Sequence, residues 1–299
     1  MSVKFNVDTQ VIFNIGDPMD HSCATYMHNA VYKLMNVNAV NLTTIIPKGG
    51  LPQFIEAAKT LGSTGFDLTT PHKADIVPFL DKCEPAAAAF GCVNCVKIEN
   101  GKLSGIGVDG IGLALAVKSR FGSLEGKKVL VLGAGSVAGL AVNELCKSGV
   151  SKITIANRTV EKAVFIAKTI QNLHGFTCDC GPMEREFLLE AAKDADLVVQ
   201  CTSTGRPEHA EYPGLCITEV LPQDCKVVDV LYPDTQLLSA ARERGLETMN
   251  GQRMMVFQQI PKMKFRFGID FPEELLLEVE EAVAVGVTMV KFRNEHLEK

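Results

Sequence analysis

The sequence predicts an α/β protein of two domains, the second built on a doubly wound parallel sheet, with C-terminal helices that return to the first domain. Three observations predict this fold. Apolar runs of strand length alternate with helical patterns along the chain. A glycine-rich turn directly follows one of these runs. The length of 299 residues is more than one ordinary hydrophobic core accommodates.

The first third of the chain alternates strand-like and helix-like segments. Val11–Ile15, Asn41–Ile46 and Gly65–Leu68 have the apolar character of strands, and helical patterns follow the first two. Such alternation is typical of an α/β unit with a largely parallel sheet. We place this domain at residues 1–112.

A second unit begins near Gly126. Val129–Leu132 is a continuous apolar run bounded by glycine, which is typical of a parallel strand buried on both faces. Further strands are expected at residues 152–156, 197–200 and 227–230, with a helix at 160–173. We place this domain at residues 113–251. Residues 252–299 read as helices, and we expect them to complete the first domain because they are too few to form a domain alone.

Composition limits the partners. Thirty Lys and Arg against thirty-five Asp and Glu give a net charge of −5, and no basic run stands out, so we expect no nucleic acid and no membrane partner. No apolar stretch reaches the roughly eighteen residues that span a bilayer. The first residues show no apolar signal region, so a cytoplasmic location is expected. The pattern leaves both a monomer and a homodimer open.

The cysteines and histidines do not form a metal-binding pattern. Cys92 and Cys95 form an isolated C-x-x-C, whereas a zinc site would need a second pair or paired histidines. Buried thiols are favoured over a redox pair, which stays open as the alternative. His21, His28 and His72 lack the spacing of metal ligands, so we expect them to serve local hydrogen bonds and packing.

A cofactor site is indicated at Gly133-x-Gly135-x-x-Ala138. This turn comes directly after a buried strand and opens a helix, as in the Rossmann dinucleotide-binding fold. The first glycine allows the tight turn, the second lets the backbone approach a pyrophosphate, and the helix N-terminus favours the negative charge. A glycine-rich turn that serves only packing is the alternative.

The end of the next strand indicates which nicotinamide binds. NAD-selective domains usually place an acid there to bind the ribose hydroxyls. This chain has Asn157-Arg158-Thr159, with Lys162 one turn later. A guanidinium can hold a 2′-phosphate through charge-assisted hydrogen bonds, so NADP is favoured and NAD is the less favoured cofactor. In the alternative interpretation, Arg158 only stacks on the adenine or faces solvent.

Several segments together resemble the shikimate dehydrogenase family. They occur in the family's order from residue 16 to residue 258, and this ordered co-occurrence is specific although no single segment is. The segments are Gly16-Asp-Pro18 with His21-Ser22 and His28-Asn29, Thr69-Thr-Pro71-His-Lys73, Gly91-Cys-Val-Asn94, Asp109-Gly110-x-Gly112, Gly133-Ala-Gly135, Asn157-Arg158-Thr159, Thr202-Ser-Thr-Gly205, Asp229-x-x-Tyr232-Pro233-x-Thr235, and Gly251-x-x-Met254-x-x-x-Gln258.

The resemblance implies an NADP-linked dehydrogenase that interconverts a ring alcohol and its ketone, of the shikimate and 3-dehydroshikimate type. It implies Lys73 and Asp109 as the catalytic pair, which suits a reaction that must remove a hydroxyl proton. The implied substrate-binding residues are Ser22, Thr69, Asn94, Tyr232 and Gln258. The implied cofactor-binding residues are Gly133, Ala134, Gly135, Ser136, Val137, Asn157, Arg158, Thr159, Lys162, Thr202, Ser203 and Met254.

The chain also departs from the family's pattern. Ala24 and Val108 replace residues that carry hydroxyls, Gly107 and Asn41 replace an asparagine and a tyrosine, and Arg206 replaces a methionine. Quinate or another cyclic polyol is therefore an alternative substrate to shikimate. A regulatory protein that binds the nicotinamide without turnover is the alternative from another class, although the retained Lys73 and Asp109 favour an enzyme.

Overall fold

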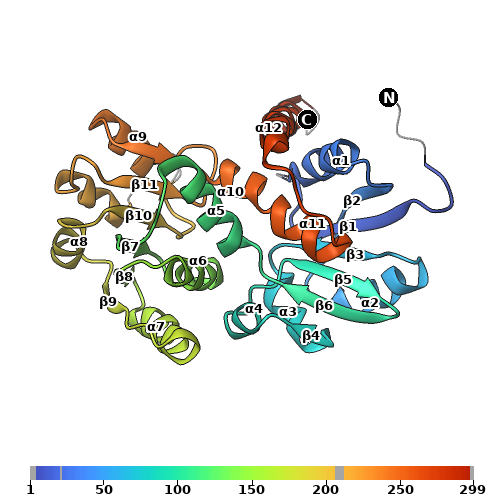
Figure 1. Ribbon diagram of the computed structural model, residues 1–299, viewed down its shortest axis with the longest axis horizontal. Helices are drawn as coiled ribbons and strands as arrows, with labels where there is room; N and C mark the ends of the chain where they lie inside the picture. Colours follow the sequence, from blue (N-terminus) through green and yellow to red (C-terminus); the bar gives the residue numbers. More distant parts are fainter. Residues whose placement is uncertain (1–4, 21, 206–211, 297–299) are drawn as a thin grey trace. The chain divides into compact units, whose positions relative to one another are not determined.

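The computed structural model describes residues 5–20, 22–205 and 212–296, and the chain divides into two compact units (Figure 1). The first unit comprises Met1–Val108 and Gln258–Lys299, and the second comprises Asp109–Phe257. These bounds lie a few residues from the expected ones because helices α5 (Asp109–Phe121) and α10 (Gly251–Phe257) pack against each other within the second unit.

The first unit is built on a six-stranded sheet in the order β2-β1-β3-β5-β6-β4. Its elements are β1 (Gln10–Gly16), α1 (Ala24–Leu34), β2 (Ala39–Ile45), α2 (Leu51–Thr60), β3 (Gly65–Leu68), α3 (His72–Asp75), η1 (Val77–Phe79), β4 (Lys82–Cys83), α4 (Pro85–Ala89), β5 (Cys95–Glu99), β6 (Lys102–Ile106), α11 (Gln259–Phe267), η3 (Glu273–Leu275) and α12 (Leu276–His296).

The sheet of the first unit is rich in parallel pairings, as expected, but one of its strands is antiparallel to its neighbours. Strand β1 pairs in parallel with β2 and β3, but β5 runs antiparallel to both β3 and β6. Strands β5 and β6 are antiparallel because a two-residue hairpin turn joins them at Asn100-Gly101, where both residues have positive φ, 53° and 74°. An Asn-Gly pair is favoured in such a turn because its twist matches that of the strands.

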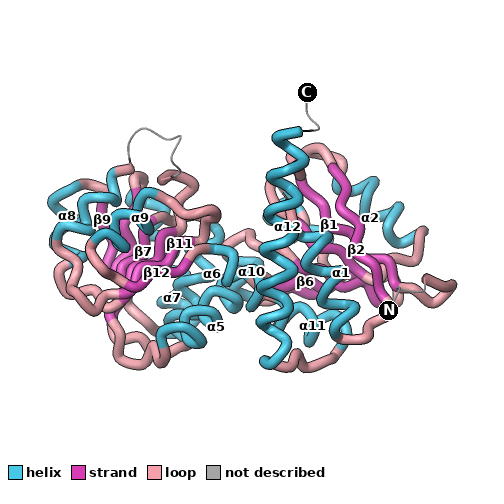
Figure 2. The backbone as a smooth tube through the Cα atoms, turned by 90° about the horizontal axis from the view of Figure 1, so that it is seen from above, coloured by secondary structure: helices cyan, strands magenta, loops and turns pink. Residues whose placement is uncertain are grey.

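The C-terminal helices return to the first unit, as predicted. Helix α12 packs against α1, and the two lie side by side in Figure 2. Its buried residues Val279, Val283, Gly286 and Val290 form one stripe at helical spacing. At Gly286 a Cβ would lie 3.0 Å from the Cβ of Tyr26, so glycine permits the close approach of the helices. Helix α11 packs on β5.

The second unit is a six-stranded sheet in which every pairing is parallel. Besides α5 and α10, its elements are β7 (Lys128–Leu132), α6 (Ser136–Lys147), β8 (Lys152–Asn157), α7 (Val160–His174), β9 (Asp179–Pro182), α8 (Arg185–Ala192), β10 (Leu197–Gln200), η2 (Pro213–Glu219), β11 (Lys226–Asp229), α9 (Gln236–Glu243) and β12 (Glu247–Met249).

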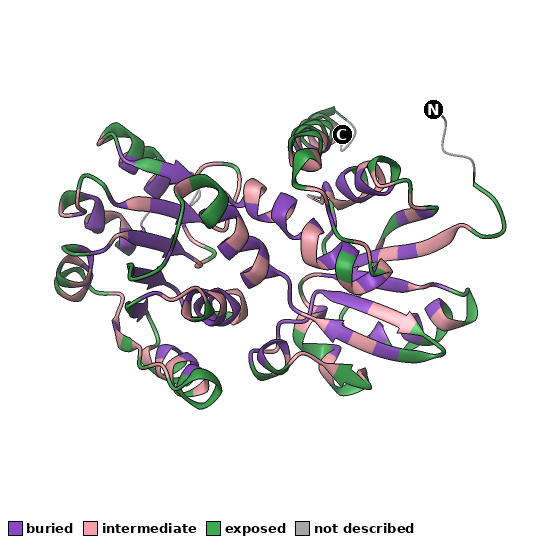
Figure 3. Cartoon of the chain, viewed as in Figure 1, coloured by how far each residue is buried: buried purple, intermediate pink, exposed green. Residues whose placement is uncertain are grey.

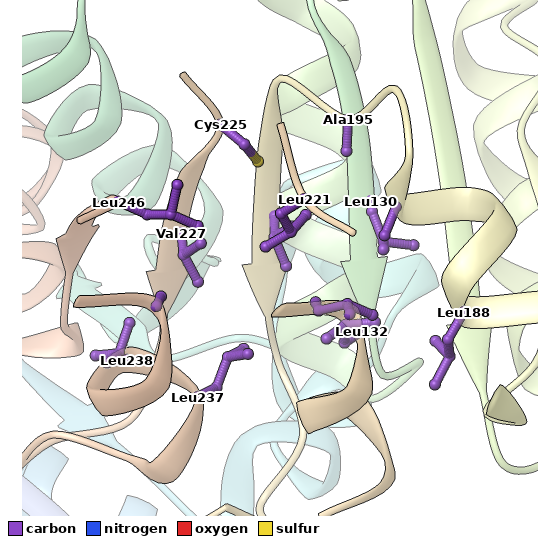
Figure 4. Close-up of a cluster of buried hydrophobic side chains, with 14 of the residues drawn as sticks. Leu130, Leu132, Leu188, Ala195, Leu221, Cys225, Val227, Leu237, Leu238 and Leu246 are labelled. Atoms are coloured by element: carbon purple, nitrogen blue, oxygen red, sulfur yellow. The ribbon is translucent and has the colours of Figure 1, made fainter. Parts of the chain in front are cut away.

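The strand order of the second unit is β12-β11-β10-β7-β8-β9. Numbered within the unit this is the order 6-5-4-1-2-3, the doubly wound Rossmann arrangement that the sequence predicts. The central strands are buried along their length (Figure 3). A core cluster that includes Leu130, Leu132, Val227 and Leu237 covers one face of the sheet (Figure 4).

The strand order changes direction between the parallel strands β7 and β10, because β8 and β9 continue from β7 to one side and β10 to β12 lie on the other. These two strands lie side by side, with Leu132 opposite Gln200. In open α/β sheets, ligands bind outside the carboxyl ends of the strands at such a switch point. Of the expected cofactor residues, Gly133 to Val137 follow β7 and Thr202 and Ser203 follow β10. Within the described part of the chain, no helix is long and apolar enough to cross a membrane.

Candidate functional site

The turn after β7 has the geometry of a pyrophosphate-binding loop. Gly133 has a φ of +106°, and a Cβ there would lie 3.0 Å from Thr202 Cγ2 and 3.1 Å from the Thr202 nitrogen. Glycine is therefore required at this position. Gly135 has an ordinary φ of −81°, and a Cβ there would meet nothing within 4 Å. Open space in front of this backbone fits a dinucleotide phosphate.

Helix α6 presents its N-terminus at the same place. Gly135 is the N-cap, Ser136 and Val137 begin the helix, and no side chain of the described residues caps it. The first N–H groups of a helix lack intrahelical partners and carry a partial positive charge, so they suit an anion. The residues present thus fit the pyrophosphate of a dinucleotide.

The end of β8 shapes this turn from the side. The Ala134 N–H donates to Asn157 Oδ1 at 3.1 Å, and Asn157 Nδ2 donates to the Thr159 carbonyl at 2.8 Å. Asn157 therefore joins the glycine turn to the N-cap of α7. Arg158 and Lys162 are exposed beside it. Two cations at this edge offer charge-assisted hydrogen bonds to a phosphate.

A buried polar network holds the loop after β10. The side chain of Gln200 accepts from the Thr202 N–H and donates to the Thr204 carbonyl at 3.0 Å. Asp229, at the end of β11, accepts from Thr235 Oγ1 at 2.7 Å. Burial raises the pKa of Asp229 to about 6, against the effect of these hydrogen bonds. The network fixes the segment that carries Thr202 and Ser203.

Three of the expected substrate-side residues converge at the end of β3 in the first unit. The Thr69 carbonyl accepts from the His72 N–H at 2.9 Å, and the Lys73 carbonyl accepts from the Val93 N–H at 3.1 Å. The Asn94 carbonyl accepts from the Leu68 N–H at 3.1 Å. Thr69, Lys73 and Asn94 therefore lie on neighbouring segments.

Asn94 also reaches the segment that leads to Asp109. Its Oδ1 accepts from the Val108 N–H at 2.9 Å, which fixes the orientation of the amide. Asp109 follows Val108 directly in the chain, is buried, and is the first residue of α5. The remaining expected residues are placed individually. Ser22 precedes α1, Gln258 is the N-cap of α11, Tyr232 follows β11 and Met254 is buried in α10.

A buried charged cluster, which the sequence analysis missed, joins β3 to α11 in the first unit. Asp67 on β3 contacts Lys262 Nζ at 3.2 Å and Arg266 Nη2 at 3.1 Å, and all three are buried. Burial alone would raise the pKa of Asp67, but the two cations outweigh it and hold that pKa well below its usual value. An acid within a buried strand and two cations spaced i, i+4 were the available sequence signals.

The described histidines serve hydrogen bonding, as predicted. His28 Nδ1 lies 3.1 Å from Gln259 Oε1, and His28 Nε2 lies 3.6 Å from Asp67. Burial, aided by the charge of Lys262, lowers the pKa of His28 to about 3. His72 Nε2 lies 2.7 Å from the Ile46 carbonyl. His21 and Arg206 lie outside the described residues.

The C-x-x-C segment is buried. Cys92 and Cys95 are both inaccessible to solvent, and burial raises the pKa of Cys95 to about 11. Arg266 Nη2 lies 3.2 Å from Cys95 Sγ. A buried, protonated thiol is a poor nucleophile. Among the described residues, no three His, Cys, Asp or Glu side chains are grouped to hold a metal ion.

The doubly wound sheet with an open glycine turn at its switch point, joined to a second α/β unit, defines a dinucleotide-binding oxidoreductase. More narrowly, the chain belongs to the shikimate dehydrogenase family. Residues 15–96 match the shikimate dehydrogenase substrate binding domain, and residues 115–210 match shikimate / quinate 5-dehydrogenase. The chain is 33% identical over 282 residues to shikimate dehydrogenase (NADP(+)) of Alkaliphilus metalliredigens, covering 93% of this chain and 99% of that one.

Solved structures agree with this assignment. A shikimate dehydrogenase crystallised in complex with NADP+ is similar with a TM-score of 0.83 at 31% identity, covering 95% of this chain and 98% of that one. A quinate dehydrogenase from Corynebacterium glutamicum in complex with NAD is similar with a TM-score of 0.82 at 26% identity, covering 93% and 99%.

Proposed function

We propose that this chain is an NADP-dependent dehydrogenase that interconverts a cyclic hydroxy acid and its ketone, of the shikimate and 3-dehydroshikimate type. The observation that carries the proposal is the open glycine turn at the switch point, with Arg158 in place of an acid at the end of β8. The names of the relatives and the NADP+ complex support the same cofactor.

The cofactor would be held by the turn and the two neighbouring strand ends. The backbone of Gly133 to Val137 would receive the pyrophosphate at the N-terminus of α6. Arg158 and Lys162 would bind the 2′-phosphate, and Thr159 lies between them. Asn157, Thr202 and Ser203 shape the rim of this site, and Met254 would pack near the nicotinamide. When bound, NADP supplies the hydride acceptor for oxidation of the alcohol.

Lys73 and Asp109 are the proposed acid–base pair. Oxidation of an alcohol requires that its hydroxyl proton be taken up as the carbonyl forms, and a positioned side chain provides this route. In our proposal, Lys73 Nζ exchanges the proton with the substrate oxygen, and Asp109 orients the ammonium. Two hydrogen bonds support the proposal: the Val93 N–H donates to the Lys73 carbonyl, and the Val108 N–H, one residue before Asp109, donates to Asn94 Oδ1.

The substrate would be bound by polar side chains that the family resemblance implies. Ser22 and Thr69 would receive its carboxylate, Asn94 and Gln258 its ring hydroxyls, and Tyr232 its far side. Quinate remains a second candidate, because Ala24 and Val108 lack hydroxyls and because a quinate dehydrogenase shares the fold. The sequence is compatible with both a monomer and a homodimer, and a measurement of the molar mass in solution distinguishes the two.

Turnover tests the proposal against the non-catalytic alternative. The purified chain is mixed with NADP+ and, separately, shikimate, quinate and an unrelated cyclic polyol, and NADPH formation is followed. We expect turnover with at least one of the two acids. Binding of NADP+ without turnover on any substrate would favour the regulatory protein instead.

A further inference from the structure

Three polar side chains form one row across the first sheet. The register of the parallel strands places Asn14 of β1 opposite Thr43 of β2 and opposite Asp67 of β3. Side chains that face each other across parallel strands lie on the same face of the sheet, about 4.8 Å apart from strand to strand. Asn14 is buried, whereas Thr43 is exposed. The row therefore runs from the surface to the buried charged cluster.

The row reaches Ser22 through Asn14. Ser22 Oγ accepts from Asn14 Nδ2 at 3.2 Å and from the Ala24 N–H at 3.3 Å. A hydroxyl oxygen has two acceptor positions and one proton. The two N–H donors occupy both acceptor positions, so the Ser22 hydroxyl can interact with a further group only by donating its proton. The group that meets Ser22 must consequently be a hydrogen-bond acceptor.

A second pair of hydroxyls lies beside Ser22. Thr25 and Thr43 form a hydrogen bond between their hydroxyls, and Asn14 Nδ2 lies 3.4 Å from Thr43 Oγ1. Thr25 follows Ala24, the position where the expected hydroxyl is missing. Asn14 thus links Ser22 with the Thr25–Thr43 pair, and the chain offers hydroxyls at this place despite Ala24.

The local charge favours an anion. Lys262 and Arg266 bring two positive charges to the single negative charge of Asp67, the next residue of the row after Asn14. Hydroxyl protons available for donation, together with an excess positive charge in the same row, suit a carboxylate.

We propose that Asn14 is a positioning residue that sets Ser22 as a donor, and that Asn14, Ser22, Thr25 and Thr43 form a specificity-determining subsite for the carboxylate of the substrate. This inference rests on the proposed function for the identity of the substrate. It assigns the carboxylate contacts of this chain to Thr25 and Thr43 in addition to Ser22.

The test is a double-mutant cycle on KM. Shikimate oxidation is measured for the wild type, Asn14→Leu, Ser22→Ala and the double variant, with Thr44→Val as the control, because Thr44 is the next residue of β2 and its side chain lies on the opposite face of the sheet. We expect Asn14→Leu to raise KM for shikimate about tenfold with kcat within about twofold, as expected for a lost binding contact. In the Ser22→Ala background the same change raises KM by a smaller factor, because only the contact of Asn14 with Thr43 is left to lose. Thr44→Val leaves both constants unchanged.

A neutral substrate separates a carboxylate contact from a merely structural role. With the methyl ester of shikimate, we expect Asn14→Leu to change KM by less than about threefold, because the charged contact is absent in the wild type too. Thr43→Val, at an exposed position, provides a second variant if Asn14→Leu does not fold, and we expect a severalfold higher KM for shikimate.

Two results would overturn the inference. One is an equal effect of Asn14→Leu with and without Ser22, and the other is an equal effect on the acid and its ester. If the wild type turns over neither shikimate nor quinate, the proposed function fails separately. Calorimetric titration of shikimate then decides the subsite: binding weakened by Asn14→Leu supports it, and absent or unchanged binding refutes it.

Discussion

Arg158 directly follows β8, and we propose that it selects NADP over NAD. We expect Arg158→Ala to weaken NADP binding by about 1.5–3 kcal/mol, because a charge-assisted contact to the 2′-phosphate is lost, and to leave NAD binding nearly unchanged. Titration of both cofactors measures the difference. Lys168→Ala, an exposed cation further along α7, is the control and should alter neither affinity. Equal affinities of the wild type for NAD and NADP would rule out the assignment.

His28 gives a pH dependence of stability. Its folded pKa of about 3 lies below the ordinary value of 6.5, so the unfolded chain takes up the proton first as the pH falls. The stability contributed by neutral His28 is present above pH 6.5 and is lost between pH 6.5 and 3, at up to about 1.4 kcal/mol per pH unit. The stability contributed by Asp229 changes with pH in the opposite direction. Its pKa is raised in the folded state, so its contribution becomes more favourable as the pH falls.

Comparison with variants isolates the histidine. Urea unfolding of the wild type, His28→Gln and His174→Gln is measured at pH 7 and pH 5. The contribution of Asp229 is common to all three and cancels. We expect the loss of stability on acidification to be smaller for His28→Gln and to be retained for the exposed His174→Gln. Identical pH dependence of the wild type and His28→Gln would contradict the buried, neutral assignment.

At the scale of an element, the two glycines of the turn between β7 and α6 should respond differently to substitution by alanine. Gly135→Ala should leave stability within about 0.5 kcal/mol, because its φ is ordinary and the space is open. Its NADP affinity should fall about tenfold or more, since the methyl group occupies the approach of the pyrophosphate. Gly133→Ala should instead destabilise the fold by about 1–3 kcal/mol through its positive φ.

Thermal unfolding and NADP titration of the two variants check this pair. An unchanged NADP affinity in folded Gly135→Ala would show that no phosphate approaches this turn.

The ion pairs of Asp67 join β3 to α11. Gln258, Lys262 and Arg266 are spaced i, i+4 and i+8, and the last two contact Asp67, which lies two residues before Thr69. The pairs thereby fix α11 against the strand that leads to Thr69. We expect Asp67→Asn to cost about 3–5 kcal/mol, because it leaves buried cations without their counter-charge. Glu56→Gln, in an exposed pair with Lys59, should cost less than about 1 kcal/mol. Chemical denaturation compares the two, and similar losses would refute the role of the cluster.

The helices and strands that could be predicted from the sequence are the ones with long, regular apolar patterns. Val129–Leu132 and the helix after Gly135 were predictable because a buried parallel strand and a glycine turn carry local signals. Strands β5 and β6 were missed, although Asn100-Gly101 marks their hairpin. The Asn14–Ser22 and Asp67–Arg266 contacts could not be predicted, because they join residues distant in sequence through strand register and helix packing.

At the scale of the whole molecule, the proposed cofactor and substrate residues divide between the two units. In our proposal, the dinucleotide-binding residues belong to the second unit, and Lys73 and most of the substrate contacts belong to the first. The family assignment establishes the fold and the class of enzyme, whereas the departures at Ala24 and Val108 leave the substrate to be measured.

The most direct test of the central claim is NADP+-dependent oxidation of shikimate by the wild type and Lys73→Ala. The account predicts turnover by the wild type, and for Lys73→Ala a kcat lower by a factor on the order of 10²–10⁴ with NADP affinity nearly unchanged, because only the acid–base group is lost. Lys48→Ala, an exposed lysine of the same unit, should retain wild-type kcat. A Lys73→Ala variant that keeps more than about a third of wild-type kcat would contradict the account.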